Sequence, residues 1–306
     1  MEQPPTVSPF SGSSIKPSLT PFSNCIYLKL YIGTKWAEKL LTDIISKLVK
    51  ELRKKEIINK WFFIRYNDPQ AHIRLRFFIK DGSHGTSIDI IGKWLKNYIH
   101  HELIWDIQLG TYQRELERYG YSTMEDCEDY FCNDSELVLK LLPHFKKLKD
   151  ADKIALVIFY MNTLFKQFSL SDLSIVSLCK SQLDAFSREF NLEDNKQFRM
   201  RLSSEYREQS NILKDIFSSG ISLSAELNMC RILIERSFYK SKKNIHSITN
   251  KIIGNSNAER KIISSLIHMF INRLFDYDQR YKELVIYYMI SKYYDSYKAR
   301  KQHAEE

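Results

Sequence analysis

Three basic side chains recur at every second position between residues 72 and 76. These are His72, Arg74 and Arg76, and they share one face if the segment is a strand, because side chains alternate between the two faces of a strand. The strand rise would place the two guanidinium groups about 6–7 Å apart. Paired planar donors at that separation suit a carboxylate or a phosphate. An amphipathic strand with a solvated polar face explains the same residues.

A second basic cluster lies in residues 111–120, where Arg114 and Arg118 are four positions apart with glutamates beside them. If the segment begins a surface helix, these residues form ion pairs that add little to stability. The chemical alternative is that one arginine faces the pair in residues 72–76. The three arginines would then form one anion pocket.

The third group is a histidine in residues 262–274, a segment with helical periodicity. The apolar residues fall on one arc and leave His268, Asn272 and Ser265 on the opposite side. An exposed histidine is common on such a face. A histidine whose tautomer is held by a partner is also the usual proton-transfer group near neutral pH, so His268 is the candidate for proton transfer.

The elements that must position these groups begin after residue 24. Hydrophobic residues recur with a period of two in some segments and with a helical period in others. The resulting order is strand, helix, hairpin, helix, strand, which is the split βαβ pattern of ferredoxin-like units. The predicted ranges are 26–32, 34–52, 61–66 with 72–79, 86–101 and 103–109.

The rest of the chain is predicted to be helical. The fold class is therefore α+β, with a ferredoxin-like antiparallel sheet unit on the N-terminal side packed against a mostly α-helical C-terminal part. We expect a flexible segment over 1–24, an α+β part over 25–120 and a helical part over 121–300, together forming one domain. The predicted helices are 123–142, 152–168, 172–190, 195–218, 222–239, 258–275 and 281–300.

Composition excludes several classes of protein. The 306 residues contain too few Gly and Pro for a collagen-like or disordered chain, and the net charge of +9 favours an anionic partner. The odd number of cysteines, five, indicates reduced thiols. No apolar run reaches the roughly 20 residues of a membrane helix, and no phosphate-binding, nucleophile-elbow, zinc or nucleic-acid motif occurs. We expect a cytoplasmic protein whose basic stretch 239–243 lies in a solvated loop.

Residues 61–69 and 72–77 resemble the signature of the C-terminal elimination domain of class I lanthipeptide dehydratases. The thiopeptide-type bacteriocin biosynthesis proteins share this domain. Three further landmarks agree and occur in the family's order over about residues 26–297, namely 112–120, 131–135 and 268–274. The large glutamylation domain that precedes this one in full-length dehydratases has no counterpart among these residues.

The resemblance implies a β-elimination. A Ser or Thr of a precursor peptide is first esterified with glutamate from glutamyl-tRNA, and this domain removes the glutamate to leave dehydroalanine or dehydrobutyrine. Arg74, Arg76 and Arg114 match the glutamate-binding arginines, and His268 matches the elimination histidine as acid or base. The residues then expected to bind substrate are Arg65, His72, Tyr112, Arg118 and Asn272.

The resemblance also implies partners and leaves two alternatives. The expected partners are a ribosomally made precursor peptide, with a leader and a glutamylated core, and a separate glutamylation subunit. A homodimer is left open, and no metal, organic cofactor, nucleic acid or membrane is implied. The chain could instead be a thiopeptide cyclase that joins two dehydroalanines by aza-cycloaddition into a pyridine or piperidine and releases the leader. The second alternative is a non-catalytic subunit that docks the precursor.

Two positions depart from the family's pattern. Gln113 stands where an acidic residue is common, and Tyr121 replaces the second glycine that usually follows Arg118 and Tyr119. Both affect the loop beside Arg114, and neither removes a charged group. Because the arginines and His268 are all present, we favour elimination over cycloaddition.

Overall fold

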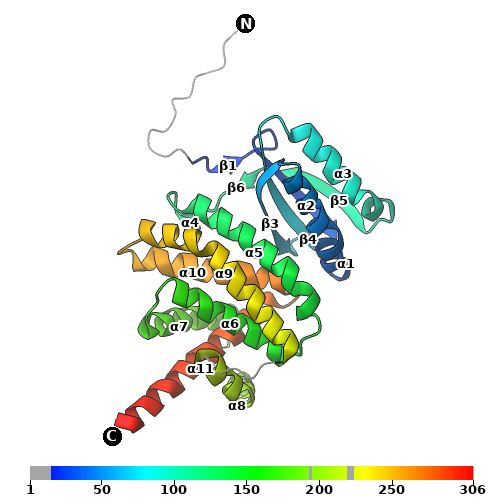
Figure 1. Ribbon diagram of the computed structural model, residues 1–306. Coiled ribbons are helices and arrows are strands. Elements are labelled where there is room, and N and C mark those ends of the chain that lie inside the picture. The colour runs from blue at the N-terminus through cyan, green and yellow to red at the C-terminus, as the bar shows by residue number, and fades with distance from the viewer. Residues whose placement is uncertain (1–14, 193–194, 219–223, 306) are drawn as a thin grey trace.

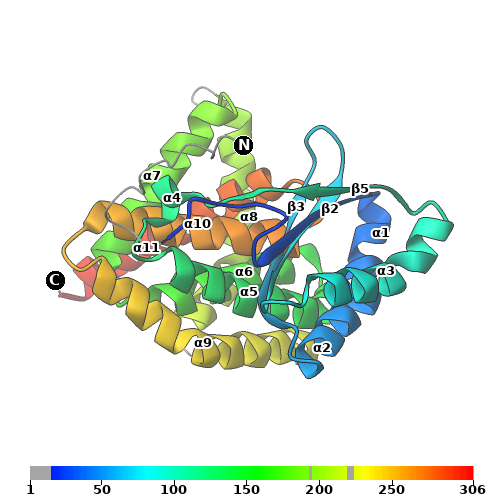
Figure 2. The same cartoon turned by 90° about the horizontal axis from the view of Figure 1, so that it is seen from above.

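The computed structural model describes residues 15–192, 195–218 and 224–305. A sheet with short helices against it forms the N-terminal side of the molecule, and longer helices form the rest (Figure 1). Figure 2 shows the sheet standing between the first helices of the chain and the long C-terminal ones. The three segments singled out in the sequence therefore have to meet where the sheet faces the long helices.

The sheet contains four antiparallel strands in the order β3-β4-β2-β5. All four correspond to predicted strands, and β4 has the predicted bounds. Strand β3 begins earlier than the predicted residue 61. The strands are β2 (Cys25–Ile32), β3 (Ile58–Tyr66), β4 (His72–Ile79) and β5 (Ile104–Gly110).

Helices following β2 and β4 pack against the sheet. The helix predicted over 34–52 is a continuous run that contains a π-helical turn, and the helix predicted over 86–101 is α3. Their buried side chains, such as Leu48, Leu52 and Leu95, belong to the same apolar core as the strands. The segments are α1 (Thr34–Lys39), η1 (Leu40–Ile45), α2 (Ser46–Lys54) and α3 (His84–His100).

A short second sheet joins the chain's beginning to the segment after β5. Ser18 pairs with Gln113 and Leu19 with Tyr112, and Leu19 is buried. Residues 15–24 are thus packed against the fold, whereas residues 1–14 of the predicted flexible segment lie outside the described residues. The elements are β1 (Ser18–Leu19), β6 (Tyr112–Gln113) and the short helix α4 (Leu116–Tyr119).

The C-terminal part is helical, as predicted, and α5 and α10 pack along β3. Each predicted helix is present, with ends shifted by a few residues in most cases. The helices are α5 (Met124–Phe145), α6 (Asp150–Gln167), α7 (Asp172–Glu189), α8 (Lys196–Ser218), α9 (Ala225–Lys251), α10 (Ser256–Leu274) and α11 (Gln279–Glu305).

Helix α9 corrects one prediction. The basic stretch 239–243, expected in a solvated loop, lies in the middle of this helix. Its apolar pattern continues past the lysines, because Ser241, Ile245 and Ile248 are buried while the lysines remain exposed. The lysines form part of the charged face of an amphipathic helix, and a run of lysines does not by itself end a helix.

Side chains from α5 and α10 seal the outer edge of β3. The Asn272 side chain accepts a hydrogen bond from the Arg65 backbone N–H and donates one to the Arg65 carbonyl, both at 2.9 Å. Arg273 Nε donates to the Phe63 carbonyl at 2.7 Å, and the Phe63 N–H donates to Ser135 Oγ at 3.3 Å. The helical part therefore satisfies the outward-facing backbone groups of Phe63 and Arg65 on this edge strand.

The α+β class predicted from the sequence is confirmed. The ferredoxin-like label stays a prediction that is compatible with the strand order, and so does the division into 25–120 and 121–300. All five cysteines are free and buried, which agrees with the predicted reduced thiols. In the part of the chain that the structure describes, no helix has the length and apolar character needed to cross a membrane.

Candidate active site

A cavity of about 510 Å³ lies between the polar face of the sheet and α10. It receives side chains from β2, β3, β4, the segment after β5, α4 and α10. Arg74, Arg76 and His268, which the sequence predicts to converge, all line it. The full lining is Tyr27, Lys29, Ile64, Tyr66, Arg74, Arg76, Gly110, Thr111, Gln113, Glu115, Arg118, His268, Met269 and Asn272.

Arg76 is a buried arginine inside an aromatic cage. Its guanidinium carbon lies 4.6 Å from the ring centre of Tyr27, 4.6 Å from that of Tyr112 and 5.2 Å from that of Phe62. The residue is 7% exposed, and its Nε has no hydrogen-bond partner among the described residues. Burial lowers the pKa of Arg76 from its ordinary value, and the Arg74 charge acts in the same direction.

Arg74 is held by a ring on one side and a histidine on the other. Its guanidinium lies 3.5 Å from the ring centre of Tyr66, and its Nε donates to His72 Nε2 at 2.9 Å. His72 Nδ1 lies 2.7 Å from the Gln70 carbonyl, so the proton is assigned to Nδ1. Burial lowers the pKa of His72, and the Arg74 charge lowers it further. His72 is therefore neutral, and it orients Arg74.

In the part of the chain that the structure describes, neither Arg74 nor Arg76 is paired with a carboxylate. A buried charge without a partner is costly. The cavity carboxylate Glu115 instead pairs with Arg118, at 3.0 Å. Two uncompensated guanidinium groups in one cavity are a site for an anionic ligand.

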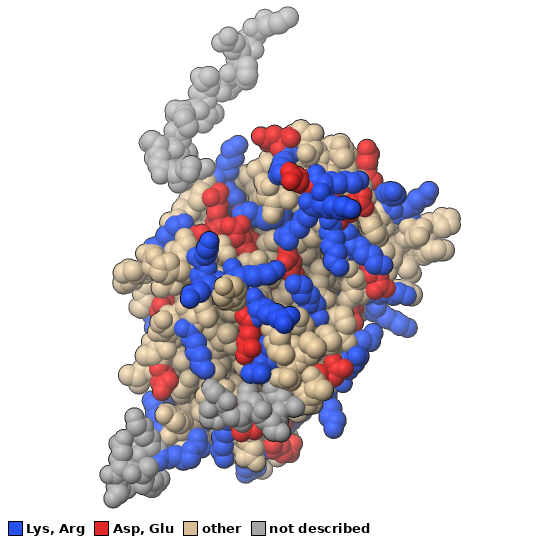
Figure 3. Space-filling model, in the orientation of Figure 1, with Lys and Arg blue, Asp and Glu red and all other residues tan. Residues whose placement is uncertain are grey.

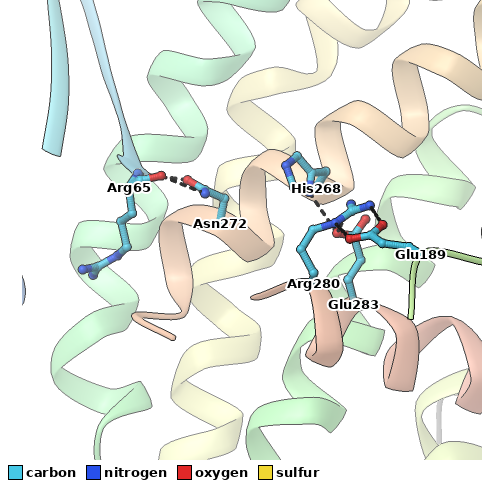
Figure 4. A network of polar contacts seen from close by, with 6 residues as sticks. All are labelled: Arg65, Glu189, His268, Asn272, Arg280 and Glu283. Carbon is cyan, nitrogen blue, oxygen red and sulfur yellow. Dashed lines mark hydrogen bonds and ion pairs between the residues drawn. The ribbon is translucent and has the colours of Figure 1, made fainter. Parts of the chain in front are cut away.

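His268 is oriented by a buried carboxylate on the next helix. Its Nδ1 lies 2.9 Å from Oε2 of Glu283, a residue that is 1% exposed. Figure 4 shows the chain of contacts from His268 through Glu283 to Arg280 and Glu189. Because an ionised carboxylate can only accept hydrogen bonds, the Nδ1–H group donates one to Glu283. Nε2 is then the ring nitrogen that is left for a ligand. This is the arrangement of a histidine prepared for proton transfer.

Arg114 does not line the cavity, which departs from the glutamate-binding role that the resemblance implies for it. Its Nε and Nη2 donate to the two carboxylate oxygens of Glu128, at 2.8 and 2.9 Å, and its Nη1 donates to the Lys16 carbonyl. Arg118 lines the cavity instead. Helix α4 begins only at Leu116, so Arg114 precedes the helix and does not share a helical face with Arg118.

Four predicted substrate-binding residues play different parts around the cavity. Arg65 lies outside it, with 5% exposure and its Nε bonded to the Arg273 carbonyl. Tyr112 is a wall of the Arg76 cage, and His72 stands behind Arg74. Asn272 lines the cavity, while its amide also bonds to the β3 backbone (Figure 4).

Several residues in or beside the cavity were not predicted from the sequence. Glu283 was not singled out, although a lone carboxylate followed by the apolar run 284–287 is a signal for a buried acid. Tyr27, Lys29 and Tyr66 share the polar face with Arg74 and Arg76 through the strand register. That register depends on which strands pair, and the pairing of β2 with β4 could not be read from periodicity.

The wider surface does not identify the ligand. Lys and Arg are spread over most of the face seen in Figure 3, with Asp and Glu among them. No cluster of His, Cys, Asp and Glu in the described residues could hold a metal ion. The arrangement of Arg74 and Arg76 in the cavity is therefore what indicates an anion-binding site.

Comparison with known proteins gives a family match over most of the chain. The family described as lantibiotic biosynthesis dehydratase C-term matches residues 26–294. Nisin biosynthesis protein NisB of Lactococcus lactis subsp. lactis is 28% identical over 284 residues, covering 90% of this chain and 26% of NisB. Subtilin biosynthesis protein SpaB of Bacillus subtilis is 26% identical over 288 residues, covering 92% of this chain and 26% of SpaB. This chain spans about a quarter of the length of these relatives.

Solved structures share the fold at low sequence identity. The tRNA-dependent lantibiotic dehydratase MibB of Microbispora sp. 107891 superposes with a TM-score of 0.68 and 18% identity, over 97% of this chain and 29% of MibB. The pyridine synthase TbtD from thiomuracin biosynthesis superposes with a TM-score of 0.63 and 12% identity, over 90% of this chain and 98% of TbtD. At these identities the likeness concerns the fold alone.

Proposed function

Because this chain belongs to the lantibiotic biosynthesis dehydratase C-terminal family, we propose that it eliminates glutamate from glutamylated Ser or Thr residues of a ribosomally made precursor peptide. The products are free glutamate and a peptide with dehydroalanine or dehydrobutyrine. A glutamylating activity has to act first, either in a separate subunit or in a longer chain.

One observation carries the proposal. Arg74 and Arg76, which have no carboxylate partner in the described part of the chain, share a cavity with a histidine whose Nδ1 is held by a buried glutamate. The glutamyl ester brings the free side-chain carboxylate and the free amino group of glutamate into such a site. Paired arginines bind the carboxylate, and the histidine lies beside them for proton transfer.

The proposed chemistry requires a single proton transfer on the enzyme. The α-proton of the modified residue moves to the free Nε2 of His268, the C–O bond of the ester breaks, and the bonding electrons leave with glutamate as a carboxylate. A leaving carboxylate needs no proton at neutral pH, so the reaction requires a base and no acid. Arg74 and Arg76 stabilise the charge that develops on the departing oxygen and on the enolate-like carbonyl.

The test is glutamate release from a synthetic peptide that carries one O-glutamyl serine. We expect the wild type to release glutamate and to lower the peptide mass accordingly, while Arg74→Ala and His268→Ala leave the ester intact. His246→Ala is the matched control, because His246 is an exposed histidine on α9. Full turnover by both site variants contradicts the site assignment.

A second substrate separates elimination from cycloaddition. A peptide that already contains two dehydroalanines has no glutamate to lose, and an eliminating enzyme leaves it unchanged. Formation of a macrocycle with release of the leader would instead identify a pyridine- or piperidine-forming cyclase. Binding of both peptides without any turnover would identify a docking subunit.

A further inference from the structure

The two edges of the main sheet are treated differently. The outer edge of β3 is sealed by side chains of Asn272, Arg273 and Ser135. The opposite edge strand, β5, pairs only with β2 among the described residues. Five consecutive residues of β5, from Trp105 to Leu109, are exposed. An uncovered edge strand offers a row of unpaired backbone N–H and C=O groups.

Strand β5 also lacks the features that usually protect an edge from pairing. It contains no proline and no lysine, and Asp106 is its only charged residue. Three large apolar side chains are substantially exposed, with Trp105 at 50%, Ile107 at 38% and Leu109 at 54%. A chain that pairs with β5 gains backbone hydrogen bonds and covers this apolar surface.

The strand leads directly into the candidate active site. In the register with β2, Gln108 lies opposite Lys29 and Gly110 opposite Tyr27, on the face that carries the cavity. Gly110 and the following Thr111 line the cavity. Figure 2 shows β5 running along the outer side of the sheet and on toward α4. A segment added along β5 would therefore end at the cavity.

We propose that the open edge of β5 binds the substrate peptide as an added strand, which presents the modified residue to the cavity beside Gly110. The inference rests on the proposed function and adds the way in which the peptide is held. A cavity of about 510 Å³ is of the size that encloses a small molecule. It encloses the glutamylated side chain, so the peptide backbone has to be bound outside it.

The pleat predicts a sequence preference in the substrate. If the modified side chain points to the cavity face, its immediate neighbour points to the opposite face, because strand side chains alternate. Ile107 and Leu109 lie on that opposite face, paired with Leu30 and Leu28. Apolar residues are thus favoured at odd spacings from the modified residue, on the side that follows β5. Polar residues are accepted at even spacings.

The first test uses wild-type protein and a backbone N-methyl scan of a synthetic peptide with one O-glutamyl serine. A methylated nitrogen cannot donate a hydrogen bond. We expect kcat/KM to fall about 2- to 10-fold at every second position on one side of the serine, and to change little at the positions between. A profile without a period of two overturns the proposal.

The second test compares a long and a minimal substrate. Ile107→Asp should lower kcat/KM for the long peptide about 10-fold, the cost of losing one apolar contact of this size, and leave release from N-acetyl-O-glutamyl-serine methylamide unchanged. Met229→Asp, on α9 and 45% exposed, is the matched control. Equal losses on both substrates, or no loss on either, overturn docking along β5.

The outcomes separate this inference from the proposed function. If wild type releases no glutamate from either substrate, the proposed function fails. If it releases glutamate and the Ile107→Asp variant behaves as wild type, the docking inference alone fails. The open edge could instead pair with a second copy of the chain, and light scattering tests this by measuring the oligomeric state. A dimer that Ile107→Asp converts into a monomer, with peptide kinetics unchanged, overturns the proposal.

Discussion

Arg273 and Arg76 are both buried, at 1% and 7% exposure, but their surroundings differ in whether a carboxylate pairs with the guanidinium group. Arg273, at the edge of β3, donates to Asp134 at 2.6 Å and to the Phe63 carbonyl at 2.7 Å. Arg76, in the cavity, has three aromatic rings around it and no carboxylate partner in the described residues. Arg273 is paired with a carboxylate, whereas Arg76 has no carboxylate partner in the described residues.

The difference separates a structural charge from a binding charge. The Arg273–Asp134 ion pair and the Arg273 bond to Phe63 connect α5 and α10 to the sheet, so these interactions stabilise the folded state. The cage around Arg76 positions a guanidinium without satisfying it, so the interaction energy remains available to a ligand. The same substitution in both regions should therefore have opposite consequences.

The largest effect is expected from Arg273→Met. This change leaves the Asp134 carboxylate, 3% exposed, without its positive partner, and it removes the donor to the Phe63 carbonyl. Breaking a buried pair on one side costs about 3–5 kcal/mol of unfolding free energy, which urea denaturation followed by circular dichroism measures. A loss below about 1 kcal/mol would place this pair with surface ion pairs and remove the contrast.

Arg76→Met should do the reverse. Removing a buried charge that has no partner costs no stability, and the unfolding free energy should stay level or rise. Glutamate release should fall about 10²- to 10³-fold, the typical loss for a donor that stabilises developing charge. Steady-state kinetics and urea denaturation on the same preparation give both values. A destabilised variant that retains activity would make Arg76 a structural residue like Arg273.

Glu283→Gln sharpens the comparison with an intermediate case. Glu283 is buried and paired, as Asp134 is, but its partner His268 faces the cavity. The amide still accepts a hydrogen bond from Nδ1 of His268, but it has no negative charge beside the ring during proton transfer. We expect kcat to fall about 10-fold, less than the roughly 10²- to 10⁴-fold that general acid–base catalysis contributes, because His268 itself remains, while KM is unchanged. Glu283→Asp should recover part of kcat, which a general loss of folding would not allow.

The sequence was sufficient where the pattern is local. Strand β4 was predicted with its bounds because one of its faces is aliphatic and the other carries the basic residues, so the period of two is complete within the segment. Strands β1 and β6 were missed because each has two residues. Two residues carry no period, and their pairing joins segments far apart in the chain.

The candidate site was predicted in part, for related reasons. Arg74 and Arg76 could be assigned to one face because they share a strand. Arg114 was placed in the site by its match to the family's motif, but it pairs with Glu128 on α5, a partner that the motif does not reveal. The bond between His268 and Glu283 joins two helices, and only tertiary packing determines which residues of two helices meet. Spacing along the chain therefore predicted faces, and did not predict partners.

The smallest effect tests how the unpaired arginines are held. Burial lowers the pKa of His72 in the folded protein. As the pH falls below about 6.5, His72 is therefore protonated in the unfolded chain while it is still neutral in the folded protein. The stability from this residue is complete above that pH and is lost at up to about 1.4 kcal/mol per pH unit until the folded-state pKa is reached. His72→Gln keeps a donor for Gln70 and an acceptor for Arg74 but cannot titrate. The difference in urea-unfolding free energy between wild type and variant should therefore shrink or reverse from pH 7 to pH 5, and a constant difference would show that His72 is not the buried neutral acceptor of Arg74.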